Sequence, residues 1–241
     1  MKVLFLFLFE FLLFLSVRGF REELEDCNFE KCADDELSDS LMEVRFMPND
    51  EQLRDLCPAA LQYVNCIIEE AETCLGKTVE EMERSPVPTF GKILSGGRSL
   101  AQDICDENSQ FRQDYLENRQ CIRGFIMAGS RLCRKEGVNI ADIIMGPSDD
   151  KLDDEEDETR ECLIGTYEVS CLIMELEDTC GETAQKMFVD VMSRLKGMSL
   201  SICDNKDTAA AIRSKLFDYL ELEGGVRSKL DIALNRLIKK R

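Results

Sequence analysis

Cysteine is the residue type with which this chain could do most chemistry. Its twelve thiols could bind zinc, act as nucleophiles or form disulfides, and the chain contains no histidine. Zinc sites commonly use C-x2-C pairs, and no two cysteines here have that spacing. An even, dense cysteine count is typical of a disulfide framework in an exported protein. We therefore predict structural disulfides at Cys27, Cys32, Cys57, Cys66, Cys74, Cys105, Cys121, Cys133, Cys162, Cys171, Cys180 and Cys203.

The absence of histidine removes the commonest general base and metal ligand. Ser-His-Asp and Cys-His catalysis are therefore excluded. The glycine-rich segment 95–99 lacks the Lys-Ser/Thr of a phosphate-binding loop. Carboxylates are so numerous that no acid–base pair can be singled out. We predict a chain that is not an enzyme and has no catalytic, metal-binding or cofactor-binding residues and no cofactor.

Residues 1–19 have the pattern of a secretory signal peptide. Lys2 precedes a run of Leu and Phe, and Val17 and Gly19 are small enough for the cleavage positions. The alternative is a membrane anchor, which needs about 18–20 uninterrupted apolar residues, whereas Glu10 interrupts this run. No later stretch is long and apolar enough to span a bilayer. The expectation is a secreted, extracellular protein without a transmembrane span in its mature chain.

The chain is strongly acidic, with 48 Asp and Glu against 30 Lys and Arg and a formal net charge of −18. Such a charge disfavours nucleic acid as a partner, because phosphates require Lys and Arg. The densest acid run, PSDDKLDDEEDETR, cannot bury itself and is interpreted as an exposed linker. The predicted domains are an N-terminal segment (20–50), a first helical cysteine-rich unit (51–146), the acidic linker (147–160), and a second helical unit with a basic C-terminal helix (161–241).

Apolar residues recur at helical spacing through most of the chain, and no segment shows sustained strand alternation. One predicted helix starts near Ala60, with Pro58 in its first turn and Gly76 as its C-terminal cap. Further helices are expected over 90–104, 109–135, 163–174, 184–198, 209–220 and 226–238. The fold class is all-α, a disulfide-stapled helical bundle.

Two parts of the chain share a cysteine spacing, which favours two related helical halves over a coincidence. The two sets are Cys57, Cys66, Cys74 and Cys105, and Cys162, Cys171, Cys180 and Cys203. Nine residues turn a helix by about 180°. Cys57 and Cys66 should therefore point to opposite sides of their helix, as should Cys171 and Cys180, so that one helix can be stapled to two different neighbours. Connectivity cannot be read from sequence. We expect bridges mostly within each half, with Cys27 and Cys32 joined to each other or tying the N-terminal segment to the body.

Two apolar or basic features have competing interpretations. Met187, Phe188, Met192 and Met198 could line an adaptable ligand pocket or simply form core. The segment 226–241 could lie on an anionic membrane surface or pack on this protein's own acidic body, with its cations near the helix C-terminus. Core and self-packing are the favoured interpretations.

The run CDENSQFRQDYLENRQCIRGF, the later Cys133 and the pattern C-x8-C-x8-C-G with a further Cys-Asp carry a resemblance. They resemble arthropod secreted cysteine-rich proteins of the insect 27-kilodalton hemolymph glycoprotein family. The TCG segment is alternatively similar to the nematode secreted domain of unknown function nineteen. Either resemblance implies a helical extracellular protein without assigned enzymatic activity.

The functional expectation is a secreted, non-enzymatic binding or carrier protein whose partner is an unknown protein or an apolar small molecule. One alternative is a secreted effector or venom-type component that acts on proteins or membranes. Another is a precursor cut at Arg160 or at Arg241.

Overall fold

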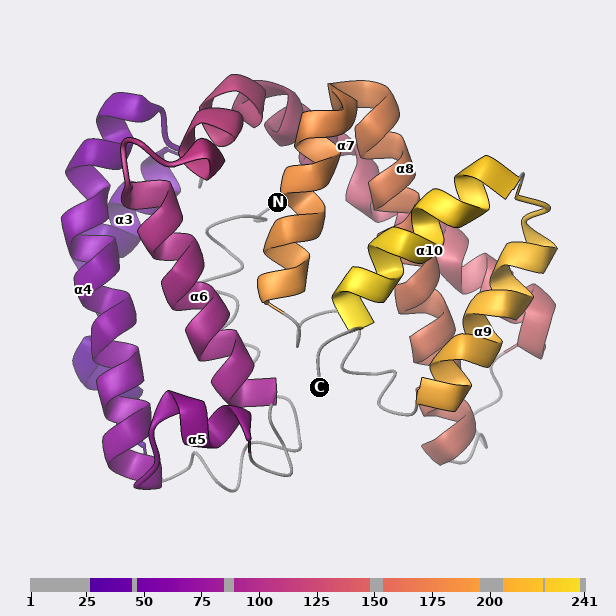
Figure 1. The fold of residues 1–241 in the computed structure, drawn as a ribbon, viewed down its shortest axis with the longest axis horizontal. Coiled ribbons are helices and arrows are strands. Elements are labelled where there is room, and N and C mark those ends of the chain that lie inside the picture. The colour runs from indigo at the N-terminus through magenta and orange to yellow at the C-terminus, as the bar shows by residue number, and fades with distance from the viewer. Residues whose placement is uncertain are drawn as a thin grey trace. The chain divides into compact units, whose positions relative to one another are not determined.

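The structure is built from helices (Figure 1). This computed structural model describes residues 27–44, 47–84, 89–147, 154–195, 206–222 and 224–238. Every regular element in these ranges is helical, and disulfides join the helices, which confirms the predicted fold class. The expected signal peptide, residues 1–19, lies outside them. Within the described ranges, no helix is long and apolar enough to cross a membrane.

The chain divides into two compact units, Met1–Arg119 (unit 1) and Gln120–Arg241 (unit 2). The division falls inside α7 (Gln110–Met145), not at the acidic segment 147–160. Helix α8 (Asp154–Arg194) begins within that segment, and two disulfides join α7 to α8 across it. This division differs from the boundary expected at 147–160, of which residues 148–153 lie outside the described part of the chain. Acidic residues are favourable in the first turn of a helix, so an acid run need not be a linker.

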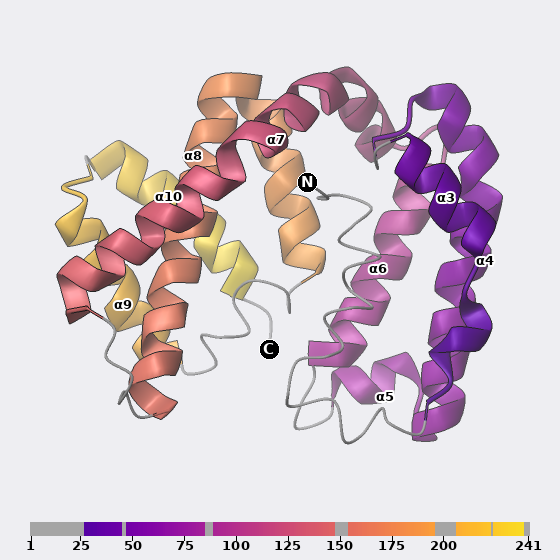
Figure 2. The same cartoon turned by 180° about the vertical axis from the view of Figure 1, so that it is seen from behind.

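Within the described residues, unit 1 starts with the short helix η1 (Phe29–Cys32), followed by α3 (Asp35–Glu43) and the long α4 (Asp50–Leu75). Figure 2 shows α3 alongside α4, where Leu37 and Leu41 bury their side chains against Leu56 and Ala60. Helix α4 ends at Gly76, which has the left-handed φ of 63° that favours glycine. The predicted C-terminal cap is thus confirmed.

The start of α4 differs from the sequence expectation. The helix begins at Asp50, so Pro58 lies in its interior instead of its first turn. A reciprocal capping box fixes this start: Gln52 N donates to Asn49 Oδ1 at 2.9 Å, and Asn49 N donates to Gln52 Oε1 at 2.8 Å. An interior proline costs about 3 kcal/mol. The capping box and the complete burial of Leu53 offset that cost.

Helices α5 (Val79–Glu83) and α6 (Thr89–Cys105) complete the bundle of unit 1 with the first turns of α7. In Figure 1, α6 runs beside α4 with α5 at their ends. The close approach of α5 and α6 requires a glycine, because a Cβ on Gly91 would lie 2.5 Å from Glu83 N. Gly96 and Gly97 are buried within α6, which stays continuous through them.

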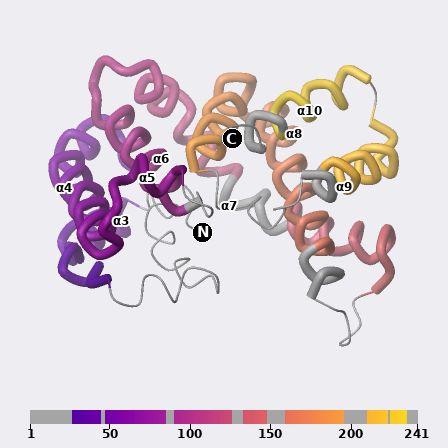
Figure 3. The backbone as a smooth tube through the Cα atoms, turned by 60° about the horizontal axis from the view of Figure 1, so that its bottom comes forward, coloured from indigo at the N-terminus to yellow at the C-terminus, as the bar shows by residue number. Residues whose placement is uncertain are grey.

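Unit 2 contains the rest of α7, α8, α9 (Lys206–Tyr219) and α10 (Gly224–Ile238). Both α9 and α10 pack against α8 (Figure 3). Two separately predicted helices form α8, and they meet at Gly181, whose φ of 86° and ψ of 173° are not helical. Between Cys162 and Cys171 every residue except Glu168 is buried, so this part of α8 is the centre of the unit's core.

The methionine stripe of the second half of α8 also belongs to the core. Met187 and Met192 are 5% and 7% exposed, and Phe188 is half-buried. Met198 lies outside the described residues. This burial supports the core interpretation over the pocket interpretation.

Candidate functional site

The described cysteines of this chain form disulfides. Five are described: Cys27–Cys74, Cys32–Cys66, Cys57–Cys105, Cys121–Cys180 and Cys133–Cys171. Cys162 is also disulfide-bonded, and none of the described cysteines is free. Cys203 lies outside the described residues. Cys27 and Cys32 join the N-terminal segment to α4. This confirms the second of the two expected alternatives and not a bond between Cys27 and Cys32.

Helix α4 is held on two sides, as its cysteine spacing predicts. Cys57 bonds to Cys105 at the end of α6, and Cys66 bonds to Cys32 in η1. The same expectation was wrong for α8, because Cys171 and Cys180 both bond to α7. Helical periodicity gives the direction of a side chain but does not say which element lies there.

Bridges were expected mostly within halves divided at 147–160, and two of the five cross that segment. The division inside α7 instead groups Cys121 and Cys133 with the second half of the chain. Each of the five bridges lies within unit 1 or within unit 2.

One group of potential metal ligands occurs near a disulfide in unit 2. The ligand atoms of Cys133, Cys171 and Glu175 all lie within 4.8 Å of one another. The two sulfurs are bonded to each other, however, at 2.05 Å. Zinc is bound by thiolates, so this group cannot act as a zinc site while the disulfide is intact.

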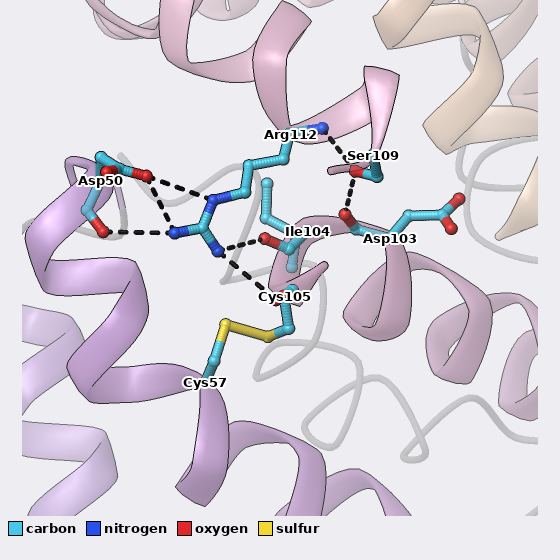
Figure 4. Close-up of a disulfide and its surroundings, with 7 residues drawn as sticks. All are labelled: Asp50, Cys57, Asp103, Ile104, Cys105, Ser109 and Arg112. Carbon is cyan, nitrogen blue, oxygen red and sulfur yellow. Dashed lines mark hydrogen bonds and ion pairs between the residues drawn. A yellow bond between two sulfur atoms is a disulfide. The ribbon is translucent and has the colours of Figure 1, made fainter. Parts of the chain in front are cut away.

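A buried arginine organises the surroundings of the Cys57–Cys105 bridge (Figure 4). Arg112 is 2% exposed, and its Nη2 donates to Asp50 Oδ1 at 2.9 Å. Its Nη1 donates to the carbonyl oxygens of Ile104, at 3.1 Å, and Cys105, at 3.5 Å. These are carbonyls at the end of α6, where a helix has no partners of its own. Arg112 therefore joins α4, α6 and α7 at the disulfide.

The start of α7 adds a second polar contact to this junction. Ser109 Oγ accepts a hydrogen bond from Arg112 N at 3.0 Å and donates to Asp103 O. The hydrogen bond from Arg112 holds the pKa of the Asp50 carboxyl below its ordinary value of 3.8, with a smaller contribution from Arg54. Sequence analysis missed Arg112, since a single arginine in an amphipathic helix normally indicates a solvated face.

Another buried charge lies at the N-terminal disulfides. Glu70 is 7% exposed, accepts a hydrogen bond from Asn28 N at 2.9 Å and forms an ion pair with Lys31. Asn28 and Lys31 directly flank Cys27 and Cys32 in sequence. Glu70 thus reinforces the attachment of the N-terminal segment to α4.

Two tyrosine hydroxyls are hydrogen-bond donors within their units. Tyr115 Oη donates to Pro48 O at 2.8 Å in unit 1, and Tyr167 Oη donates to Glu136 Oε2 at 2.7 Å in unit 2. Burial raises the pKa of both phenols, and Glu136 adds to the rise at Tyr167. Both hydroxyls therefore remain protonated near neutral pH, where they cannot serve as general bases.

The basic C-terminal helix α10 packs on unit 2. Leu230, Ala233 and Leu234 are buried. Lys229 Nζ lies 2.8 Å from Glu177 Oε1, and Arg227 Nη1 lies 2.7 Å from Asp218 Oδ1. Residues 239–241 lie outside the described part of the chain. The paired cations support packing on the protein's own acidic surface over contact with a membrane.

Exposed large apolar side chains occur mainly in unit 2. Within the described residues, Met42 is the only exposed large apolar side chain of unit 1. Those of unit 2 are Val138, Ile143, Met145, Tyr219, Val226 and Ile232. The last turns of α7 hold three of them within eight residues, and periodicity alone did not identify this surface.

Comparison with family models, with curated proteins and with solved structures gave no match. The resemblance to secreted arthropod and nematode families therefore stays a prediction.

Proposed function

We propose that this chain is a secreted, non-enzymatic extracellular binding or carrier protein. The disulfide framework carries the proposal: eleven of the twelve cysteines are disulfide-bonded, ten of them in the five described pairs. Structural disulfides form and persist in oxidising compartments such as the secretory route. Thiols held in such bonds cannot act as nucleophiles or as thiolate ligands.

Unit 2 provides the surface for a partner. Ile143 is 63% exposed and Met145 is 39% exposed at the end of α7. Exposed apolar side chains of this kind favour contact with the apolar face of a protein or with an apolar small molecule. The acidic surface of the chain disfavours nucleic acid.

Native mass spectrometry of the protein secreted by a eukaryotic host tests the proposal. We expect a denatured mass that shows twelve hydrogens lost to six disulfides, and a native species with additional mass that leaves on denaturation. Retention of the chain inside the cell, or free thiols in the secreted product, would contradict it.

A matched pair of variants tests the binding surface. Ile143→Asp should reduce the fraction of protein carrying the additional mass at least tenfold. Asn108→Asp places the same charge at an exposed position of unit 1, outside the proposed surface, and should leave that fraction unchanged. Equal loss in both variants would mean that charge, and not the apolar side chain, controls binding.

A further inference from the structure

The described disulfides of the two units pair their cysteines in the same order. In unit 1 the first bonds to the fifth, the second to the fourth and the third to the sixth: Cys27–Cys74, Cys32–Cys66 and Cys57–Cys105. In unit 2 the first again bonds to the fifth and the second to the fourth: Cys121–Cys180 and Cys133–Cys171. The third cysteine of unit 2, Cys162, is disulfide-bonded as well.

We infer that the chain contains two copies of one six-cysteine helical module, and that a Cys162–Cys203 bond closes the second. This inference does not depend on the proposed function. Six cysteines allow 15 connectivities, so unrelated units would agree in about one case in fifteen. The shared order alone is therefore an argument against coincidence, and two further observations support it.

The central helices agree in the burial of their side chains. The third and fourth cysteines are nine residues apart in both units, which aligns residue 57 with residue 162. In this alignment four buried apolar positions of α4 match buried positions of α8. The pairs are Ala60 and Gly165, Val64 and Val169, Ile68 and Ile173, and Ala71 and Leu176. Leu56 and Ile67 are also buried in α4 but match the half-buried Glu161 and Leu172. The two helices thus share part of their buried faces in the same register.

Helix α4 ends, and α8 is interrupted, at a glycine in the same alignment position. A glycine with positive φ follows the fifth cysteine, directly as Gly181 in unit 2 and one residue later as Gly76 in unit 1. The sequences TCLGKTVEEM and TCGETAQKM then continue in parallel. The methionine that ends each segment is buried, Met82 at 4% and Met187 at 5% exposure. Gly76 is in the left-handed region, with ψ of 28°, whereas Gly181 has ψ of 173°. The two glycines thus share a position and a positive φ that favours glycine, but not the same turn.

The acidic residue four positions after the fourth cysteine is a further shared feature. In unit 1 it is Glu70, which binds the segment carrying Cys32. In unit 2 it is Glu175, whose Oε2 lies 3.8 Å from Cys133 Sγ. In each unit this carboxylate therefore lies near the bridge between the second and fourth cysteines.

Digestion of the unreduced, full-length secreted protein tests the inference. Cleavage after Glu, Lys and Arg places Cys162 in residues 162–168 and Cys203 in residues 197–206, each without another cysteine. We expect these two peptides to be found joined, and to separate on reduction with a gain of two hydrogens. Finding Cys203 joined to any other cysteine, to a second molecule or to an external thiol would overturn the inference.

Two single variants provide a matched control. Cys203→Ser should expose one alkylatable thiol at Cys162 and speed amide exchange at least tenfold within unit 2, leaving unit 1 unchanged. Cys105→Ser should do the same at Cys57 and within unit 1. Equal acceleration in both units would contradict two separate modules. A variant that fails to be secreted leaves the digestion of the unmodified protein to decide.

Discussion

Replacing the buried Arg112 by methionine should destabilise unit 1 by about 3 kcal/mol. Methionine keeps the apolar stem but removes the donors to the carbonyl oxygens of Ile104 and Cys105. A buried acceptor left without a partner costs about 1–3 kcal/mol, which applies to the Ile104 carbonyl. The longer bond to the part-buried Cys105 carbonyl adds a smaller cost. The Asp50 carboxylate is not counted, because its side chain is 42% exposed and water can replace the guanidinium.

The expected consequence is a Tm lower by roughly 6–12 °C, at about 2–4 °C per kcal/mol for a protein of this size. Calorimetry with the disulfides intact measures it. Arg54→Met is the matched control, because Arg54 also pairs with Asp50 but its side chain is 57% exposed. A surface pair contributes about 0–1 kcal/mol. Equal losses of Tm in the two variants would refute the argument that burial makes Arg112 important.

The effect of Arg112→Met on Tm should also depend on pH. Arg112 lowers the pKa of Asp50 in the folded state, so this carboxylate stabilises the fold above its unfolded pKa of about 3.9. That contribution is lost as the pH falls through the lower folded value. The Tm difference between the natural protein and Arg112→Met should therefore shrink below about pH 4 without vanishing, because the bonds to the carbonyls persist. A difference that widens in acid would contradict this assignment.

Two further substitutions test packing and hydrogen bonding. Gly91→Ala should lower the free energy of unfolding by roughly 1–3 kcal/mol, because its Cβ would meet α5 backbone at 2.5 Å. Gly124→Ala, with nothing within 4 Å of its Cβ, should be neutral or slightly stabilising in denaturant titrations. Tyr115→Phe should lower the free energy of unfolding by about 1–3 kcal/mol, because Pro48 O loses its buried donor. Tyr219→Phe, at an exposed position, should leave the denaturation midpoint unchanged. A larger loss of stability in Tyr219→Phe than in Tyr115→Phe would contradict the burial argument.

The helices were predictable because apolar periodicity is a local property. The α6 and α9 stripes, for example, correspond closely to the helices in the structure. The start of α4 was misplaced because Pro58 was read as a helix start. The Asn49-x-x-Gln52 pattern of the capping box was present in the sequence and would have corrected it.

Features that depend on tertiary contact could not be predicted. The partners of Cys171 and Cys180 follow from where α7 lies, and sequence spacing contains no such information. Arg112 is buried because α4 and α6 meet beside it, and its own helix pattern does not show this. The division inside α7 was not predictable for the same reason, since α7 contributes to both units.

The separation of the disulfides by unit has a consequence for biosynthesis on the proposed export route. All six cysteines of unit 1 precede Cys121 in the chain. Synthesis at about 5–20 residues per second would deliver Cys105 to the oxidising compartment roughly 5–20 s before Cys203. Unit 1 can therefore complete its bonds while the later thiols are still arriving. Two successive sets of six allow about 225 arrangements, against about ten thousand for twelve cysteines released together, so the order of emergence itself limits mispairing.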